Sequence, residues 1–140
     1  MSTGFEDLIK IAECDYKTCL AIEDCFPDEF AVRTAAYHLQ QAVEKILKAI
    51  ILFNGETPAF THDITRLSEH CRNLGVNITQ ELDDISDTLT LWEAKSRYDP
   101  YIVFSQKKYD KAKLSYNQLS QYLKNELQQY NALENEGLEM

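Results

Sequence analysis

Arg33 and His38 are the first pair of residues whose types suggest chemistry. An arginine and a histidine separated by four residues are the catalytic pair of one class of metal-independent ribonucleases. In a helix, however, five residue steps correspond to a rotation of about 140°, so the two side chains diverge. Their neighbours are mainly alanine and leucine. The sequence therefore favours a chance co-occurrence of Arg33 and His38 in one helix over a catalytic pair.

The other two histidines raise the possibility of a metal site. His62-Asp63 and His70-Cys71 contain residue types that bind metal ions. The eight residue steps between the histidines amount to just over two helical turns, too far apart along one helix to bind one ion. We therefore predict no metal site. His62 is expected to form a hydrogen bond at a helix start and to tie its loop to a neighbouring helix.

The cysteines and the first residues of the sequence indicate the cellular compartment. The chain has four of them, Cys14, Cys19, Cys25 and Cys71, without a zinc-binding spacing around Cys14 and Cys19. The first residues lack the basic start and apolar run of a secretory signal. The longest apolar stretch, around residues 46–53, contains Lys48 and is too short to span a membrane. We expect a cytoplasmic protein with free, half-buried thiols.

Charge is distributed unevenly along the chain. The net charge of −9 repels phosphates, so long nucleic acid is not an expected partner. The segment 95–113 is basic, with six basic and two acidic residues. The basic residues are Lys95, Arg97, Lys107, Lys108, Lys111 and Lys113, and the aromatic residues Tyr98, Tyr101, Phe104 and Tyr109 lie among them. Such a mixture can hold the phosphates and base of a small nucleotide. We favour the interpretation that Lys107, Lys108 and Lys111 form a solvated face of the last helix and pair with Asp110 or with the acidic fourth helix. For Arg97, a structural role and a role in nucleotide binding are equally favoured.

The elements that must position these residues are helices. Apolar residues recur at spacings of three and four, most regularly from Val32 to Phe53, and no segment alternates like a strand. We predict helices over about residues 4–24 and 32–53, a third from a Thr61 cap to Gly75, a fourth beginning at Asn77 or Thr79, and a fifth over about residues 104–130. This pattern predicts an all-α, up-and-down antiparallel helical bundle of four to five helices. We expect residues 1–130 to form one domain and residues 131–140 to form a frayed polar tail.

Three segments, taken in order, resemble one family. They are YHLQQAVEKILKAIILFNG, THDITRLSEHC and SRYDP, and they lie within residues 31–100. They resemble the HEPN domain (higher eukaryotes and prokaryotes nucleotide-binding), whose pattern is a Gln-Ala-x-Glu-Lys-x-Leu-Lys-Ala helix, a His-Asp/Glu-hydrophobic helix start and an Arg-Tyr-Pro/Asp end. Each motif alone is weak, but together and in this order they are fairly specific.

The resemblance implies a function in binding. Such domains are helical bundles that commonly dimerise and are often encoded beside a minimal nucleotidyltransferase, as a two-component or toxin–antitoxin-like pair. The positions that match the family are Gln41, Glu44, Lys45 and Lys48 in the helix signature, His62 at the next helix start, and Arg97 with Tyr98 in the Arg-Tyr element. No cofactor is implied.

One departure from the family bears on activity. Ribonuclease members carry an arginine, four to six polar residues and a histidine in the region of Arg97, whereas no histidine follows Arg97 here. Loss of a general acid or base lowers a rate by about two to four orders of magnitude. We therefore predict a noncatalytic binding module. The alternatives are a ribonuclease that uses Arg33 and His38 across a dimer interface, and a purely structural helical adaptor.

The signature residues admit two interpretations. In the first, a polar network holds the fold, and Arg97 pairs with Glu44. The members of that network are Gln41, Glu44, Lys48 and Arg97. In the second, basic and aromatic residues surround a nucleotide phosphate. The members of that site are Lys45, Lys48, His62, Arg97 and Tyr98. We favour the network, because helical bundles often use such positions for packing.

Overall fold

The computed structural model describes residues 4–25, 28–95 and 105–139 and consists of five helices. They are α1 (Phe5–Cys25), α2 (Glu29–Phe53), α3 (Ile64–Asn73), α4 (Gln80–Lys95) and α5 (Gln106–Glu139). These described residues contain no strand. The predicted all-α helical bundle is confirmed. In the same described part of the chain, no helix combines the length and the apolar character that a membrane crossing requires.

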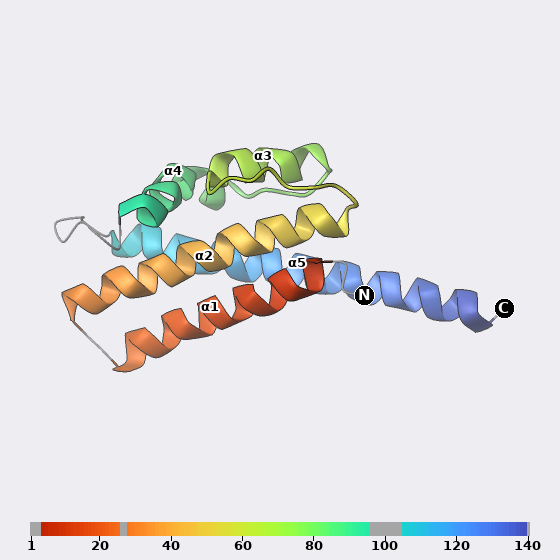
Figure 1. The fold of residues 1–140 in the computed structure, drawn as a ribbon, viewed down its shortest axis with the longest axis horizontal. Helices are drawn as coiled ribbons and strands as arrows, with labels where there is room; N and C mark the ends of the chain where they lie inside the picture. Colours follow the sequence, from red (N-terminus) through yellow and green to blue (C-terminus); the bar gives the residue numbers. More distant parts are fainter. Residues whose placement is uncertain (1–3, 26–27, 96–104, 140) are drawn as a thin grey trace.

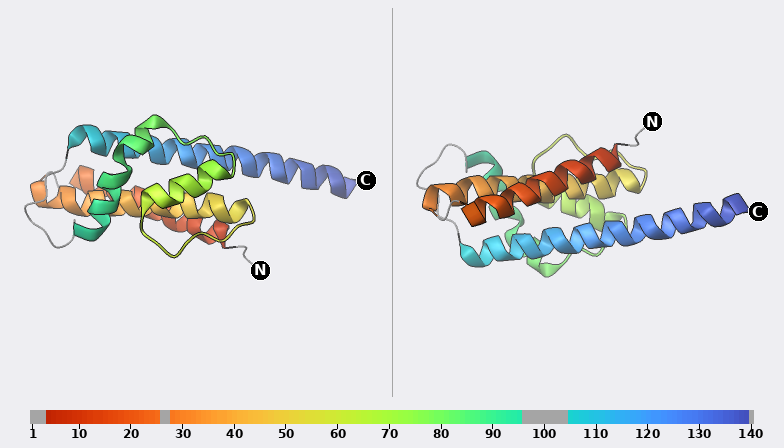
Figure 2. Two further views of the ribbon diagram at one scale, coloured as in Figure 1. Left: turned by 90° about the horizontal axis from the view of Figure 1, so that it is seen from above. Right: turned by 90° about the horizontal axis from the view of Figure 1, so that it is seen from below.

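The long helices α1, α2 and α5 lie lengthwise, and the short helices α3 and α4 cover one side of them. Figure 1 shows α1 on one side of α2, with α3 and α4 on the other. Helices α1 and α2 form an antiparallel hairpin. The loop over residues 54–63 leads the chain back, so that α3 runs in the same direction as α2, and α4 lies across the long helices (Figure 2). This return loop carries His62 over α2.

Helix α2 lies at the centre of the core. It contacts α1, α3, α4 and α5. Its fully buried apolar residues are Ala36, Leu39, Ala42, Val43, Leu47, Ala49, Ile50 and Ile51. A helix that is apolar on most of its faces is buried on most of them. The regular apolar pattern of this segment therefore predicts its central place as well as its helical structure.

Two helix starts show how local sequence sets the boundaries. The prediction from sequence that Thr61 is the N-cap of α3 is wrong. Asp63 is the N-cap, because its carboxylate accepts a hydrogen bond from the backbone N–H of Arg66 at 3.3 Å. The Thr61 hydroxyl instead accepts from the N–H of Asp63. At α4, the Thr79 hydroxyl accepts from the N–H of Leu82, which confirms one of the two predicted starts.

Helix α5 is longer than predicted. The prediction that it ends at Tyr130 is wrong, because the helix continues to Glu139. The added segment contains no proline, and the Tyr130 hydroxyl donates to Glu134 at 2.8 Å, one turn further on. The Tyr130 ring also packs edge-on against Phe53 at the end of α2, with ring centroids 6.2 Å apart. The last turns of α5 project beyond the rest of the bundle (Figures 1 and 2).

Candidate functional site

A buried carboxylate on α2, Glu44, is the centre of the candidate site. Its side chain is 4% exposed. Gln40 Nε2 donates to Glu44 Oε1 at 3.1 Å, and Lys48 Nζ donates to Glu44 Oε2 at 3.2 Å. A hydrogen bond of 2.9 Å joins His62 Nδ1 to Glu44 Oε1. Both oxygens of the carboxylate are therefore engaged, which offsets the cost of removing the charge from water.

The side-chain amide of Gln41 extends this cluster through Gln40. Gln41 Nε2 donates to Gln40 Oε1 at 2.8 Å, and both glutamine side chains are buried. The helical repeat explains the arrangement, since residues 40, 44 and 48 are four apart and lie on one face of α2. Gln40 was not singled out from the sequence. The spacing that identifies Lys48 as a partner of Glu44 also identifies Gln40, one turn in the opposite direction.

His62 connects the return loop to two helices. Besides its bond to Glu44, its Nε2 lies 3.9 Å from Oε1 of Glu93 on α4. The next residues continue the connection, because the backbone N–H of Ile64 donates to the Thr90 hydroxyl on α4 at 3.1 Å. The predicted role of His62, tying its loop to a neighbouring helix, is confirmed by these contacts.

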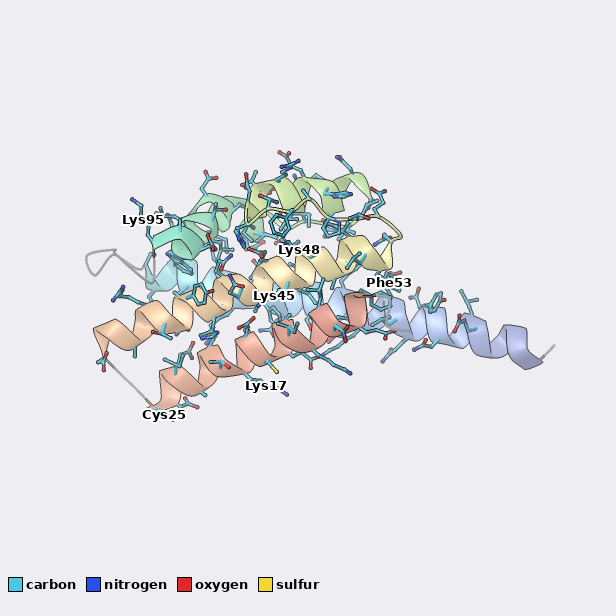
Figure 3. All side chains as sticks on the ribbon, viewed as in Figure 1. Lys17, Cys25, Lys45, Lys48, Phe53 and Lys95 are labelled. Carbon is cyan, nitrogen blue, oxygen red and sulfur yellow. The ribbon has the colours of Figure 1, made fainter. Side chains whose placement is uncertain are left out.

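Lys45 belongs to a different cluster. It lies one residue after Glu44 and is therefore rotated by about 100° around α2. Lys45 Nζ donates to Asp15 Oδ2 on α1 at 2.7 Å, and His38 Nδ1 lies 2.9 Å from Asp15 Oδ1. Lys45 and Lys48 (labelled in Figure 3) are thus held by different carboxylates. Asp15 had no local sequence signal, since its partners are on another helix.

The remaining predicted site residues, Arg97 and Tyr98, lie outside the described residues, and so does the predicted pairing of Arg97 with Glu44. Among the described residues, the structure brings Gln41, Glu44, Lys48 and His62 into one cluster through Gln40. It brings Lys45 together with Asp15 and His38 instead.

Arg33 and His38 form no hydrogen bond with each other in the described part of the chain. His38 faces α1 through its bond to Asp15. Arg33 Nε is buried and has no hydrogen-bond partner in the described part of the chain. The predicted divergence along the helix agrees with these separate surroundings.

A third polar cluster joins α1 to α5. A hydrogen bond of 2.9 Å links Cys19 Sγ to the Tyr109 hydroxyl, which in turn donates to Glu23. Lys113 Nζ donates to both Glu23 oxygens at 3.1 Å. Burial raises the pKa of Cys19 to about 11 and also raises the pKa of Tyr109. At neutral pH Cys19 is therefore a protonated thiol and a poor nucleophile.

Thiols and carboxylates are also candidate ligands for a metal ion. The four cysteines are free, but the prediction that they are half-buried is wrong, because Cys14 and Cys25 are exposed and Cys19 and Cys71 are buried. Burial raises the pKa of Cys71 to about 12. Within residues 4–25, 28–95 and 105–139, no group of three or more histidine, cysteine or acidic side chains is placed to hold a metal ion.

One lysine of α5, Lys111, pairs with the acidic helix before it, as favoured from the sequence, and Lys108 contacts a hydroxyl on the same helix. Lys111 Nζ donates to Asp84 on α4 at 3.2 Å, and Lys108 Nζ donates to the Thr88 hydroxyl at 3.2 Å. Hydrogen bonds from Gln80 and Lys111 hold the pKa of Asp84 below its ordinary value. Together with the pairing of Lys113 and Glu23, the contact between Lys111 and Asp84 matches two of the positive charges of the segment 95–113 inside the molecule.

Comparison with known proteins identifies the family of this chain. No curated protein and no solved structure matched the chain. The family model described as HEPN domain matches residues 5–127, which include all five helices except the projecting end of α5. The Glu44 cluster and His62 lie inside this match, at the positions that carry the resemblance. A match over most of the chain shows the family, and the protein therefore belongs to the HEPN domain family.

Proposed function

We propose that this HEPN domain is a noncatalytic binding module that forms a homodimer and acts with a minimal nucleotidyltransferase in a two-component or toxin–antitoxin-like system. The observation that carries the proposal is the engagement of Glu44. Its two oxygens are taken up by Gln40, Lys48 and His62. These contacts give the signature residues a role in holding α2 and the return loop together, so the motif does not require a reaction to explain it.

If the cluster around Glu44 contacts a nucleotide, its phosphate needs a positive charge that the cluster itself does not supply. The ammonium of Lys48 is paired with Glu44, and His62 lies between Glu44 and Glu93. A phosphate that approaches these residues meets two carboxylates as well as the lysine. We therefore propose that Arg97 supplies the phosphate contact and that Tyr98 offers a ring for the base.

The net charge of −9 supports the protein partner. An acidic surface attracts a partner with a basic surface and accelerates their association. The proposed nucleotidyltransferase should therefore present basic residues to this domain, and their complex should weaken as salt is added.

The test measures nucleotide and partner binding separately. Calorimetric titration with ATP should show binding to the wild type and at least about tenfold weaker binding to Arg97→Ala. Lys10→Ala, a change at an exposed lysine on α1, is the control and should bind ATP like the wild type. Lys48 is unsuitable as the test position, because its removal leaves Glu44 buried with fewer partners. The second arm is co-purification with a minimal nucleotidyltransferase, for which we propose the product of the neighbouring reading frame.

Several outcomes would contradict the proposal. A chain that sediments as a monomer, binds no ATP and forms no complex with such an enzyme is a structural adaptor instead. Binding of ATP that is unchanged in Arg97→Ala would remove the proposed phosphate contact.

A ribonuclease that uses Arg33 and His38 is a second candidate, because one contact favours it. Asp15 holds Nδ1 of His38 at 2.9 Å, an arrangement that orients an imidazole for proton transfer through its other nitrogen. RNA cleavage by the wild type that is lost in His38→Ala and kept in His70→Ala would support this candidate. Cleavage that is absent, or unchanged in His38→Ala, would eliminate it.

A further inference from the structure

A pocket lies between the segment that leads into α4 and the middle of α5, which run side by side in Figure 2. Its volume is about 220 Å³. Among the residues that line it, Leu82, Ser115 and Leu119 are buried, whereas Asn77 and Gln118 are exposed. The pocket therefore has an inner part made of buried side chains and a mouth that solvent reaches. Its described lining shares no residue with the clusters around Glu44, Asp15 and Glu23.

The hydroxyl of Ser115, in the inner part, lacks a hydrogen bond. Ser115 is 1% exposed, and its Oγ is buried without a partner among the residues that the structure describes. A serine in a helix can donate to the carbonyl oxygen four residues earlier, and Ser86 on α4 does so, with its Oγ 2.8 Å from the carbonyl oxygen of Leu82. A buried hydroxyl without a partner costs free energy. A ligand that pairs with Ser115 Oγ removes this cost.

The apolar surfaces of the pocket favour an aromatic ring. Leu82 and Leu119 offer aliphatic side chains, and Tyr122 offers a half-buried ring. Two aromatic rings in an offset or edge-on arrangement gain more free energy than their buried area alone provides. An apolar cavity of about 150 Å³ is large enough for benzene. A substituted benzene or an indole therefore fits the volume of this pocket.

The charges around the pocket disfavour an ionised ligand. Burial and the nearby carboxylate of Glu126 raise the pKa of the Tyr122 hydroxyl, which places a negative charge close to the pocket. Lys111 is paired with Asp84 at 3.2 Å and is not free to bind an anion. No described residue that lines the pocket is charged, so a carboxylate or an ammonium would lose its hydration there without gaining an opposite charge.

From these observations we infer that the pocket binds a small uncharged aromatic molecule with one O–H or N–H group, of the phenol or indole class. Its ring contacts Leu82, Leu119 and Tyr122, and its polar group forms a hydrogen bond with Ser115 Oγ. This site is separate from the proposed nucleotide contact at Arg97 and Tyr98. The inference does not depend on ATP, on a homodimer or on a nucleotidyltransferase.

The experiment is an NMR titration of the full chain with p-cresol, in which the backbone amide signals report the affinity and the place of binding. The signals of Leu82, Ser115 and Tyr122 should shift, whereas those of Glu44 and His62 should stay unchanged. Toluene, which has the same ring and methyl group without the hydroxyl, is the matched ligand and should cause shifts at the same positions.

Ser115→Ala tests the hydrogen bond. It should weaken binding of p-cresol about fivefold, which corresponds to one hydrogen bond, and should leave binding of toluene no weaker than in the wild type. Ser68→Ala is the control, because Ser68 is also 1% exposed and its Oγ also lacks a partner among the described residues, but it does not line the pocket. Binding of both ligands to Ser68→Ala should equal that of the wild type. Circular dichroism checks that both variants fold.

Charged relatives of the same ring test the requirement for an uncharged ligand. Benzoate carries a negative charge and benzylamine a positive one at neutral pH. Each should bind at least about tenfold more weakly than p-cresol, because neither charge finds a partner in the lining.

Several results would overturn the inference. If p-cresol does not bind up to its solubility limit, the pocket holds only water. Equal affinity of p-cresol for the wild type and Ser115→Ala, or an equal loss for toluene, would remove the hydrogen bond on which the ligand class depends. Shifts confined to Glu44 and His62 would place the ligand outside this pocket. None of these results bears on binding of ATP, which the Arg97→Ala titration measures separately.

Discussion

Two polar clusters of the molecule differ in how far they are buried. The Glu44 cluster contains Gln40, Gln41, Glu44, Lys48 and His62, and the Glu23 cluster, which joins α1 to α5, contains Cys19, Glu23, Tyr109 and Lys113. Each uses a carboxylate to join two elements: Glu44 joins α2 to the return loop that follows it, and Glu23 joins α1 to α5, which is distant in sequence. The Glu44 side chain is 4% exposed, whereas that of Glu23 is 30% exposed. A buried charge requires all its partners, while a half-exposed charge keeps water as an alternative. We therefore expect the two clusters to respond differently to substitution.

The largest effect should come from Glu44→Leu. Removal of the carboxylate leaves Lys48, His62 and Gln40 without their shared acceptor, and we expect a loss of about 3 kcal/mol in the free energy of unfolding. Urea denaturation monitored by circular dichroism measures this loss.

Glu56→Leu is the control for this prediction. Glu56 also pairs with a histidine, His70, at 2.8 Å, but its side chain is 52% exposed. Its replacement should cost less than about 1 kcal/mol. Equal losses in the two variants would show that burial does not distinguish them.

A smaller effect is expected for Tyr109→Phe in the other cluster. The change removes the hydroxyl that bonds to Cys19 and Glu23 but keeps the ring. The expected loss is about 1–2 kcal/mol, because Glu23 retains Lys113 and water. Trp92, whose ring centroid is 6.3 Å from that of Tyr109, provides a fluorescence signal for the unfolding curve.

Tyr130→Phe, at an exposed tyrosine, is the control for the hydroxyl alone and should be nearly neutral. A loss for Tyr109→Phe as large as that for Glu44→Leu would contradict the proposed difference between the clusters.

Alkaline pH should weaken the α1–α5 cluster through Cys19. Burial raises the pKa of Cys19 from its ordinary 9.0 to about 11 in the folded protein. The stabilising contribution is therefore fully present below pH 9 and is lost as the pH rises through about 11. The free energy of unfolding should fall over this range, and it should fall less in Cys19→Ala. Identical pH profiles for the two proteins would contradict the shifted pKa.

The smallest effect is expected for a surface ion pair. Arg72 and Asp83 are 2.7 Å apart, with side chains 44% and 39% exposed. Arg72→Ala should change the free energy of unfolding only slightly, and high salt should remove the difference. A loss comparable to that of Tyr109→Phe would mean that exposure is a poor guide to the strength of these pairs.

The two clusters also differ in how far sequence predicts them. Glu44 and Lys48 are four residues apart on one helix, so the helical repeat alone pairs them. The contact between Glu23 and Lys113 joins residues far apart in the chain. Such pairs depend on how α1 and α5 pack, and the sequence carries no local signal for them. The same reason explains why Asp15 was not identified as the partner of Lys45.

Local competition explains the boundary that sequence placed incorrectly at α3. Thr61 and Asp63 are both good capping residues. Which of them caps the helix depends on the path of the return loop, and His62 holds that path by its hydrogen bond to Glu44 on α2. The all-α fold was easier to predict, because the apolar spacing in α2 repeats over its whole length.

The most direct measurement is a double-mutant cycle on Glu44 and His62, with Glu44→Gln, His62→Ala and both together, by urea unfolding. The central claim is that residues from two separate motifs form one network that holds the fold. It predicts a coupling free energy of about 1 kcal/mol or more between the two positions. A coupling near zero would contradict the account and show that the two motifs act independently.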